Sequence, residues 1–488
     1  MIVQPTDVTA PIPVPSAGAT AATEAEAANG PVGRLEQAAM AAAAVHALQP
    51  PAPDAPKLTD QLAVLDDSLG RAYRRIAAAA QETLAISYAS EWLLDNFYVV
   101  EQALEEVEQD MPAGFYRKLP KLGASAQLPG YPRVYALAYS YLARESYQAD
   151  PDRLVRYVLA YQQVQPLTLS EVWALPVMLR LVLLEVLTIG SLHITKMPAG
   201  EGQLAAVEAR FQSIAPAAEG GVSLEDVVAS AIPSLRQLDV YDWLQFSEQI
   251  SVIHRQFQED PAGVYPYMDF DTRNRYRSQV EELAAGSGVT ELDVARAAVA
   301  LAMARAADQV PEVPAQEPVD GAGPRAATAT DSYPGLELAL PPDCHVGYYL
   351  IDVGKRQLAA QLGYRAPIGT ALRNWVLQHA TLVYLGPITI IALLILLAGL
   401  GYAAAAGATW LGLLAVALLA VVPALTVSVT LFDLAIPHFL PPRALPKLAF
   451  THGIPASCSS LVVIPGLISN TAAIDDLFGQ LEQHYLRN

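Results

Sequence analysis

Asp269 and Asp271, two aspartates one residue apart, are the clearest candidates for metal chemistry in this sequence of 488 residues. Carboxylates spaced in this way can share a divalent cation that neutralises the diphosphate of a nucleotide sugar. In that role the aspartates end a buried strand. Here the stretch YPYMDFDTRNRYRSQVEEL runs into a helical pattern that carries Arg273, Arg275 and Arg277. We therefore predict that the two aspartates have a structural role, through ion pairs, and do not bind a metal.

An aromatic and proline-rich stretch at residues 115–139, FYRKLPKLGASAQLPGYPRVYALAY, is a second candidate site. Aromatic rings stack on the faces of sugars, so this stretch could form a sugar-binding platform. Such stretches more often form an ordered loop packed on a helical core, which is the interpretation that we favour.

His452 and Cys458 could serve as metal ligands, but no second pair of ligands accompanies them, so we predict no metal site there. The two cysteines of the chain, Cys344 and Cys458, lie far apart in the sequence. They form neither a disulfide framework nor a zinc pattern, and they fit a reducing compartment.

The net charge of the chain is −19, and no stripe of Lys and Arg compensates it. Binding to the phosphates of a nucleic acid depends on clustered Lys and Arg side chains, so we expect no nucleic-acid partner. Hydrophobic residues make up 53% of the chain. This share is high for a purely soluble protein and predicts that part of the chain lies in lipid.

The first 57 residues are biased toward Ala, Pro, Glu and Thr. No basic residue precedes Arg34 and the segment has no continuous apolar core, so it does not resemble a secretory signal and is expected to stay in the cytoplasm. Such a composition buries too little apolar surface to offset the entropy of ordering. We predict a disordered tail over residues 1–57, with a weak helix near residues 34–47.

Residues 58–308 have a helical pattern almost throughout and are predicted to form a soluble all-α domain. Its helix starts are marked by capping boxes and by one cap followed by proline: Thr168–Glu171, Ser223–Asp226, Thr290–Asp293 and Asp150-Pro151. The apolar stretch at 172–187 contains Arg180 and Glu185. Each charge would cost about 2.5 to 3.5 kcal/mol in lipid, so we interpret this stretch as a buried soluble helix. Residues 309–331, rich in Pro, Ala, Gly and Thr, are predicted to be a linker.

The strongest physical signal lies between Arg373 and Asp433, where no Asp, Glu, Lys or Arg occurs. Two stretches of about 20 residues fit there, and each is long enough to cross the roughly 30 Å of a bilayer core. We predict a hairpin of two transmembrane helices, near residues 382–401 and 410–436. A buried soluble hairpin is the alternative.

The charged residues on either side of this hairpin are basic: Lys355, Arg356, Arg365, Arg373, Arg443 and Lys447. Basic residues accumulate on the cytoplasmic side of membrane helices, so we expect both ends of the hairpin, and both termini of the chain, on the cytoplasmic side of the inner membrane. Pro387 and Pro423 within the spans indicate packing against further helices. The flanking segments are a juxtamembrane stretch, 332–381, and a connector, 437–459.

Residues 460–488 are predicted to open an α/β domain. Ser460–Pro465 is short, apolar and rich in β-branched residues, as in a buried parallel strand. A helix is expected after it, capped by Asn470 or Thr471, with one apolar stripe: Ile474, Leu477, Phe478, Leu481 and Tyr485. A single βα unit cannot bury that stripe, so we expect only the start of such a domain here.

Six separated stretches resemble the N-terminal portion of cyclic β-1,2-glucan synthases, and they occur in the same order. They are EWLLDNFYVVEQ (91–102), FYRKLPKL with LPGYPRVYALA (115–138), AYQQVQPLTLSEVWALPVMLRLVLLEVL (160–187), DPAGVYPYMDFDTRNRYRSQVEELA (260–284), HVGYYLIDVGKRQLAAQLGYR (345–365) and LPPRALPKLAFTHGIP (440–455). The resemblance covers about residue 58 to the end. In that family a helical region and two membrane helices precede a cytoplasmic glucosyltransferase domain, further membrane helices and a phosphorylase-like domain.

The resemblance implies that residues 460–488 are the first βα unit of a UDP-glucose-dependent glucosyltransferase domain, with Pro465 and Gly466 at the edge of its donor site. UDP-glucose and a divalent metal are expected for the complete enzyme, but this chain lacks the catalytic base and the metal-binding acids. The expected partners are membrane lipid and the downstream part of the synthase or other membrane helices. We therefore expect a mainly α, membrane-anchored portion that is inactive alone. The alternative is a non-catalytic membrane-anchored scaffold that binds a partner or glucan.

Overall fold

The computed structural model describes residues 33–49, 58–81, 87–198, 202–214, 223–309, 340–439, 445–450, 453–454 and 471–487. The fold is mainly helical, as predicted, and the described strands β1 (Leu48–Gln49) and β2 (Lys121–Leu122) pair antiparallel. The chain divides into two compact units, Met1–Arg255 (unit 1) and Gln256–Asn488 (unit 2). This division lies inside the stretch 58–308, whose folding as one domain stays a prediction.

Unit 1 is built from helices that surround one long central helix. They are α2 (Arg34–Val45), η1 (Leu58–Gln61), α3 (Leu62–Gln81), α4 (Tyr88–Asp95), α5 (Phe97–Asp110), α6 (Ala113–Tyr116), α7 (Arg133–Arg144), α8 (Pro151–Val164), α9 (Leu169–Ile194), α10 (Gln203–Ile214), α11 (Leu224–Val240) and α12 (Trp243–Ile250), while α13 (Val252–Phe257) crosses the division.

The predicted capping residues begin helices in the structure. Asp150 accepts hydrogen bonds from the N–H groups of Asp152 and Arg153 at the start of α8, and Ser223 accepts one from the N–H of Asp226 at the start of α11. At α9 the capping box is complete, because Thr168 accepts from the backbone of Glu171 and Glu171 accepts from the backbone of Thr168. These side chains satisfy donors that a helix leaves without an internal partner, which fixes where each helix starts.

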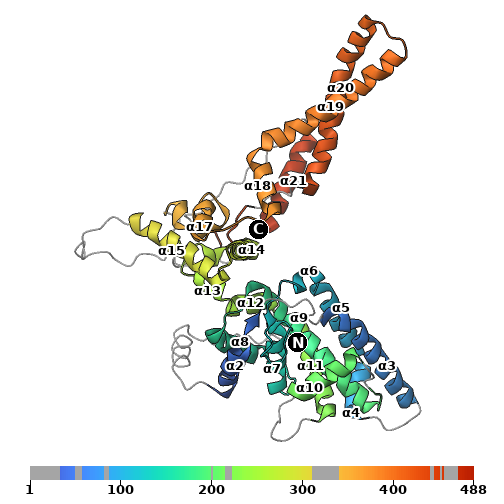
Figure 1. Ribbon diagram of the computed structural model, residues 1–488, viewed down its shortest axis with the longest axis vertical. Helices are drawn as coiled ribbons and strands as arrows, with labels where there is room; N and C mark the ends of the chain where they lie inside the picture. Colours follow the sequence, from blue (N-terminus) through green and yellow to red (C-terminus); the bar gives the residue numbers. More distant parts are fainter. Residues whose placement is uncertain are drawn as a thin grey trace, which may run out of the picture. The chain divides into compact units, whose positions relative to one another are not determined.

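Helix α9 is the centre of unit 1. It is 26 residues long, and α3, α5, α7 and α11 pack around it (Figure 1). The helix is apolar on every side, so burial on one face alone would leave hydrophobic side chains in water. At Gly190 a Cβ atom would lie 2.4 Å from a methyl carbon of Val228, so α11 can approach this closely only because residue 190 is glycine.

The weak helix expected near residues 34–47 is present as α2. Because α2 is an ordered and partly buried helix, this part of the chain is not the disordered tail predicted for residues 1–57. Leu35, Ala39 and Ala43 of α2 are buried against unit 1, where α2 packs on α8. The sequence gives little sign of this because the contact surface is made of alanines, which contribute a small hydrophobic surface each. Residues 1–32 lie outside the described part of the chain.

Unit 2 contains a helical base and a pair of long apolar helices. Its elements are η2 (Tyr265–Tyr267), α14 (Phe270–Ser287), α15 (Glu291–Gln309), η4 (Pro342–Cys344), α16 (Val346–Ile351), α17 (Lys355–Gln361), α18 (Ile368–Gln378), α19 (Ala380–Ala405), α20 (Trp410–Phe439) and α21 (Thr471–Arg487). The base is formed by α14 to α17, which pack on one another.

Three described helices are long and apolar enough to cross a membrane: α9, α19 and α20. In the most apolar stretch of α9, 89% of the residues are buried inside the protein, against 11% in α19 and in α20. Helices α19 and α20 pack along each other (Figure 1), and Gly407 adopts φ 82° in the turn that joins them. The apolar stretch at 172–187 is thus a buried helix, as predicted, whereas the side chains of α19 and α20 are mostly exposed.

The chain returns from α20 to the base of unit 2. Leu448 forms an antiparallel bridge with Met268, and the N–H of Asp269 donates to the carbonyl oxygen of Lys447 at 3.0 Å. The N–H of Ala449 donates to the carbonyl oxygen of Tyr267 at 2.7 Å. The segment after the apolar pair therefore docks at the start of α14, on the same body that precedes the pair.

The predicted βα unit at residues 460–488 is described only in its helix. Helix α21 begins at Thr471, as expected from the cap. Phe478 and Leu481 of the predicted apolar stripe are exposed. The strand proposed for 460–465 lies outside the described residues, so the βα unit itself stays a prediction.

Candidate functional site

Pro465 and Gly466, the residues predicted to border a donor site, lie outside the described part of the chain, as do His452 and Cys458. Their placement is therefore untested. The candidate site must be sought among the polar side chains that the structure does describe.

The Asp269 and Asp271 pair sits at the start of α14. The Oδ1 atom of Asp269 accepts a hydrogen bond from the N–H of Thr272 at 3.0 Å and caps the helix, while Asp271 lies in its first turn. Among the residues described, no group of three or more His, Cys, Asp and Glu side chains could hold a metal ion. The structure thus gives Asp269 a structural role as a helix cap, whereas the predicted ion pairs of the two aspartates with Arg273, Arg275 and Arg277 stay a prediction.

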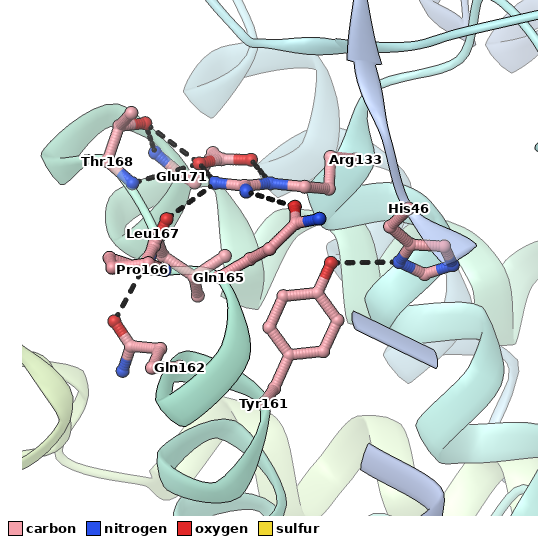
Figure 2. Close-up of polar contacts among 9 residues, drawn as sticks. All are labelled: His46, Arg133, Tyr161, Gln162, Gln165, Pro166, Leu167, Thr168 and Glu171. Carbon is pink, nitrogen blue, oxygen red and sulfur yellow. Dashed lines mark hydrogen bonds and ion pairs between the residues drawn. The ribbon is translucent and has the colours of Figure 1, made fainter. Parts of the chain in front are cut away.

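A buried ion pair in unit 1 joins Arg133 of α7 to Glu171 of α9 (Figure 2). The Nε atom of Arg133 donates to Oε1 of Glu171 at 2.7 Å, and Nη2 donates to Oε2. The same guanidinium donates to Gln165 at 3.1 Å and to the carbonyl oxygen of Pro166 at 2.9 Å. Burial lowers the pKa of Arg133, but the hydrogen bond and charge of Glu171 outweigh it and raise that pKa overall. This fork-to-fork pair locks the start of α9 against α7.

His46 lies near this ion pair, just after α2 (Figure 2). Its Nδ1 atom is 2.9 Å from the hydroxyl of Tyr161. Burial, with a smaller effect from the charge of Arg133, lowers the pKa of His46 to about 4. The imidazole is therefore neutral at pH 7. Burial also raises the pKa of Tyr161, so neither group of the pair carries charge.

A second network surrounds Glu185, in the C-terminal half of α9. Its carboxylate accepts from the hydroxyl of Tyr135 at 2.6 Å, from Nη2 of Arg210 at 2.8 Å and from the amide of Gln61. Arg210 also donates to the hydroxyl of Tyr131 at 2.9 Å. Burial raises the pKa of Glu185, and Arg210 opposes this change. The charge inside the apolar helix is thus compensated by three neighbouring elements and one loop.

Arg180, the other charge predicted inside a buried helix, also has partners within unit 1. Its Nε atom lies 2.7 Å from Oε2 of Glu106 on α5, and its Nη2 lies 3.4 Å from the carbonyl oxygen of Leu238 on α11. Every carboxylate in these networks already accepts hydrogen bonds and is removed from solvent or paired. Such a group cannot take a proton from a substrate hydroxyl while the network stays intact, so these residues hold the helices together.

Unit 2 has a linear hydrogen-bonded chain of Asp260, His345 and Tyr276. The Nδ1 atom of His345 is 2.6 Å from Oδ2 of Asp260, and its Nε2 atom is 3.0 Å from the hydroxyl of Tyr276. Asp260 also accepts from the N–H of Val346 at 2.9 Å. At Gly347 a Cβ atom would lie 1.9 Å from the hydroxyl of Tyr276, so glycine is required for this approach.

An acid, a histidine and a hydroxyl in this order can activate a nucleophile. Here the hydroxyl belongs to a tyrosine that is buried, and burial raises its pKa. These hydrogen bonds instead connect the turn between α13 and η2, which holds Asp260, with Tyr276 of α14 and with His345 at the start of α16. Sequence reasoning missed it, because Asp260 and His345 are 85 residues apart and no spacing rule joins them.

The aromatic stretch at 115–139 packs on the core. Tyr116, Leu119 and Leu122 are buried, and the amine of Lys121 lies 3.7 Å from the centre of the Tyr116 ring. Burial lowers the pKa of Lys121 to about 8. Tyr135 and Tyr139 of the same stretch are buried as well. Because these aromatic rings are covered by protein, the structure agrees with a packed loop and not with an open sugar-binding platform.

The seam between α19 and α20 is made largely of small residues. Ala392 of α19 and Ala424 and Ser428 of α20 are buried, together with the larger Ile388 of α19. Near the open end of the pair, the hydroxyl of Tyr384 donates to Oδ1 of Asp433 at 3.1 Å. Small residues allow close approach of two helices when the outer surface is apolar, as in helix pairs in lipid.

No family model matches this chain. It is 28% identical over 481 residues to the cyclic beta-(1,2)-glucan synthase NdvB of Rhizobium meliloti (strain 1021), and the alignment covers 86% of this chain. The chain spans only 16% of the length of that curated relative. The resemblance to cyclic β-1,2-glucan synthases that the sequence motifs indicated is thereby confirmed, and the longer relative is consistent with similarity to one portion of it.

Proposed function

We propose that this chain forms the helical, membrane-anchoring portion of a cyclic β-1,2-glucan synthase. The observation that carries the proposal is the 28% identity to such a synthase across 86% of the chain. Similarity over 86% of the chain extends well beyond any one apolar helix. A shared role for the whole arrangement is therefore favoured over chance similarity of one apolar stretch.

In this proposal α19 and α20 are a transmembrane hairpin with both flanks in the cytoplasm. The exposed apolar side chains of the pair support it, since they would otherwise face water. The docking of residues 445–450 on the start of α14 supports it too, because the segments before and after the hairpin then lie on one side. The basic residues Lys355, Arg356 and Arg373 on that side favour the cytoplasm.

A cysteine placed at Thr409, in the turn of the hairpin, tests this topology. In a background without Cys344 and Cys458, an impermeant thiol reagent should label the Thr409→Cys variant only from the non-cytoplasmic side. An Arg365→Cys variant serves as the cytoplasmic control and should react only in inverted vesicles. Labelling of both positions from the same side would contradict the hairpin.

We further propose that the chain alone does not transfer glucose. Forming a β-linkage from α-linked UDP-glucose inverts the anomeric carbon, which requires a base for the acceptor hydroxyl and stabilisation of the departing diphosphate. Glu185 is engaged in a buried network and Asp269 in a helix cap, and among the described residues no group of three or more His, Cys, Asp and Glu side chains could hold a metal ion. Residues 460–488 would contribute at most an edge of the donor site, at Pro465 and Gly466.

The test measures the incorporation of radiolabelled glucose from UDP-glucose into glucan. It uses membranes that hold the chain, prepared from a host without its own synthase. A full-length synthase in the same host is the positive control. We expect incorporation at the level of the empty vector. Incorporation above that level would contradict the proposal and would require a catalytic site in unit 1 or unit 2.

A further inference from the structure

A wide cleft lies in unit 2 immediately before the apolar pair. Its volume is about 950 Å³, and α14, α17, α18 and the loops between them form its walls. Four cationic side chains line it, Arg275, Lys355, Arg356 and Arg373, against two anionic ones, Glu282 and Asp352. The cleft is therefore positive in a chain whose net charge is −19.

One of the two anionic side chains of the cleft, Glu282, is already engaged in internal contacts. The Oε1 atom of Glu282 accepts from the hydroxyl of Tyr364 at 3.0 Å and lies 3.5 Å from Nζ of Lys355. Lys355 also donates to Gln279 at 2.5 Å. Burial, together with the hydrogen bond and charge of Glu282, raises the pKa of Tyr364 to about 12, so Tyr364 remains a neutral donor.

Two of the cations are available to a ligand. Arg356 and Arg373 are exposed, and neither forms an ion pair with any residue that the structure describes. They come from different helices, α17 and α18, and face the same cleft. Guanidinium groups arranged in this way suit a phosphate, which can accept several charge-assisted hydrogen bonds at once.

The two sides of helix α18 indicate the depth of this cleft relative to a membrane surface. The side of α18 that lines the cleft is mostly polar, with one leucine: Thr370, Arg373, Asn374, Leu377 and Gln378. Leu372 and Trp375, at other positions around the helix, are 60% and 47% exposed. A helix with a polar side, an exposed apolar side and a tryptophan is typical of one that lies in the plane of a membrane interface. Helix α19 begins two residues after α18 ends, so α18 sits where the hairpin would enter the bilayer.

We propose that this cleft binds the phosphate headgroup of an anionic phospholipid from the cytoplasmic leaflet. The inference rests on the membrane anchoring proposed above. If the apolar side of α18 enters the headgroup layer, the lipid phosphates lie at the depth of Arg356 and Arg373. A lipid phosphate is then supplied at high local concentration, whereas a free phosphate must compete with it from solution.

The test uses the purified full chain in detergent micelles, with native mass spectrometry to count bound lipid. Phosphatidylglycerol and phosphatidylcholine with the same acyl chains compete at equal concentration. We expect one phosphatidylglycerol to be retained in preference to phosphatidylcholine. Arg373→Gln and Arg356→Gln should each reduce this preference by about tenfold, since each removes a charged partner of the phosphate. Arg373→Lys, which keeps the charge, should restore part of it.

Arg365→Gln is the matched control, because Arg365 is exposed in the same segment but does not line the cleft. It should leave the preference within about twofold of the unchanged chain, as expected for a charge that only adds to the general attraction. An equal loss in Arg365→Gln and Arg373→Gln would overturn the proposal in favour of non-specific attraction. Equal retention of the two lipids by the unchanged chain would also overturn it.

Inorganic phosphate distinguishes the source of the ligand. If millimolar phosphate displaces phosphatidylglycerol and is itself retained, the cleft is a site for a free anion and the lipid proposal is wrong. An alkaline wash of native membranes separates this inference from the anchoring on which it rests. Release of the chain by the wash would refute both, whereas retention together with equal binding of the two lipids would refute the cleft alone.

Discussion

Helices α9 and α19 have the same length, 26 residues, and both are apolar enough to cross a membrane, yet they have opposite surroundings. Protein covers α9 on every side, whereas most of α19 is exposed. The difference in sequence is small: α9 contains Glu171, Arg180 and Glu185, and α19 contains no charged residue. Apolar length therefore does not decide where a helix lies, and the few polar residues within it do.

The physical reason lies in what each environment can offer a charge. Around α9, neighbouring helices supply Arg133, Glu106 and Arg210 at hydrogen-bonding distance. Lipid supplies no such partner, so a charged residue in a span raises the free energy of insertion. The charged partners of α9 lie on other helices. The position of α9 in the fold therefore depends on residues that are far away in the sequence.

Removing the apolar pair is the change with the largest expected effect. We expect a chain in which a short Gly-Ser linker replaces residues 380–439 to leave the membrane fraction completely, because α9 is already covered by protein and cannot serve as an anchor. Alkaline extraction followed by immunoblotting measures this. A chain without residues 34–45 is the control and should stay in the membrane. Retention of the chain that lacks 380–439 would mean that α9 or another segment is inserted.

Removing the charge inside α9 is expected to have the next largest effect. Glu185→Ala leaves Arg210 buried without its anionic partner, which costs about 3 to 5 kcal/mol of folding free energy. Asp67→Ala, which removes an exposed ion pair of 3.1 Å with Arg71, should cost less than about 0.5 kcal/mol. Thermal unfolding of the full chain in mild detergent, followed by circular dichroism, compares the two. Equal melting temperatures for both variants would show that the Glu185 network contributes little.

A smaller effect is expected from pH, and it should involve unit 1 and not the hairpin. The pKa of His46 is lowered from 6.5 to about 4 in the folded protein, so the unfolded state binds its proton first as the pH falls. The contribution of His46 to stability is thus complete above about pH 6.5 and is lost as the pH falls from there toward 4, by up to about 1.4 kcal/mol per pH unit.

The comparison of the unchanged chain with His46→Gln isolates this contribution from that of the carboxylates. The difference in melting temperature between the two should become smaller as the pH is lowered from 7 to 5, because only the histidine becomes harder to keep buried. A difference that is constant over this range would show that His46 does not titrate on unfolding.

Sequence reasoning located the helices well, because their signals are local. The cap at Thr168 and the box with Glu171 mark the start of α9, and the two charges at Arg180 and Glu185 indicated protein and not lipid around it. The same reasoning underestimated α2, whose alanines carry little hydrophobic signal of their own. Burial against α8 depends on the shape of a surface that only the folded chain provides.

The polar networks were beyond prediction from one sequence for a related reason. Gln61 and Arg210 reach Glu185 from positions 124 and 25 residues away, and neither has a property that marks it as a partner. Asp260 and His345 are a similar case. The predicted edge of a donor site at Pro465 and Gly466 lies outside the described residues and stays a prediction. The contacts of Glu185 and of Asp260 depend on tertiary structure, whereas helix caps and apolar periodicity depend on residues that are close in the sequence.

The bridge between Met268 and Leu448 has a consequence for the order of assembly. It closes a long loop of chain that contains α14 to α20, and closing such a loop is entropically unfavourable until its contents are in place. During synthesis unit 1 emerges first and has its central helix and its polar partners within its own sequence. Unit 2 can complete its base only after both apolar helices have been made and Leu448 has emerged. We therefore expect the contact of Leu448 with the base to form late, after both apolar helices have been made.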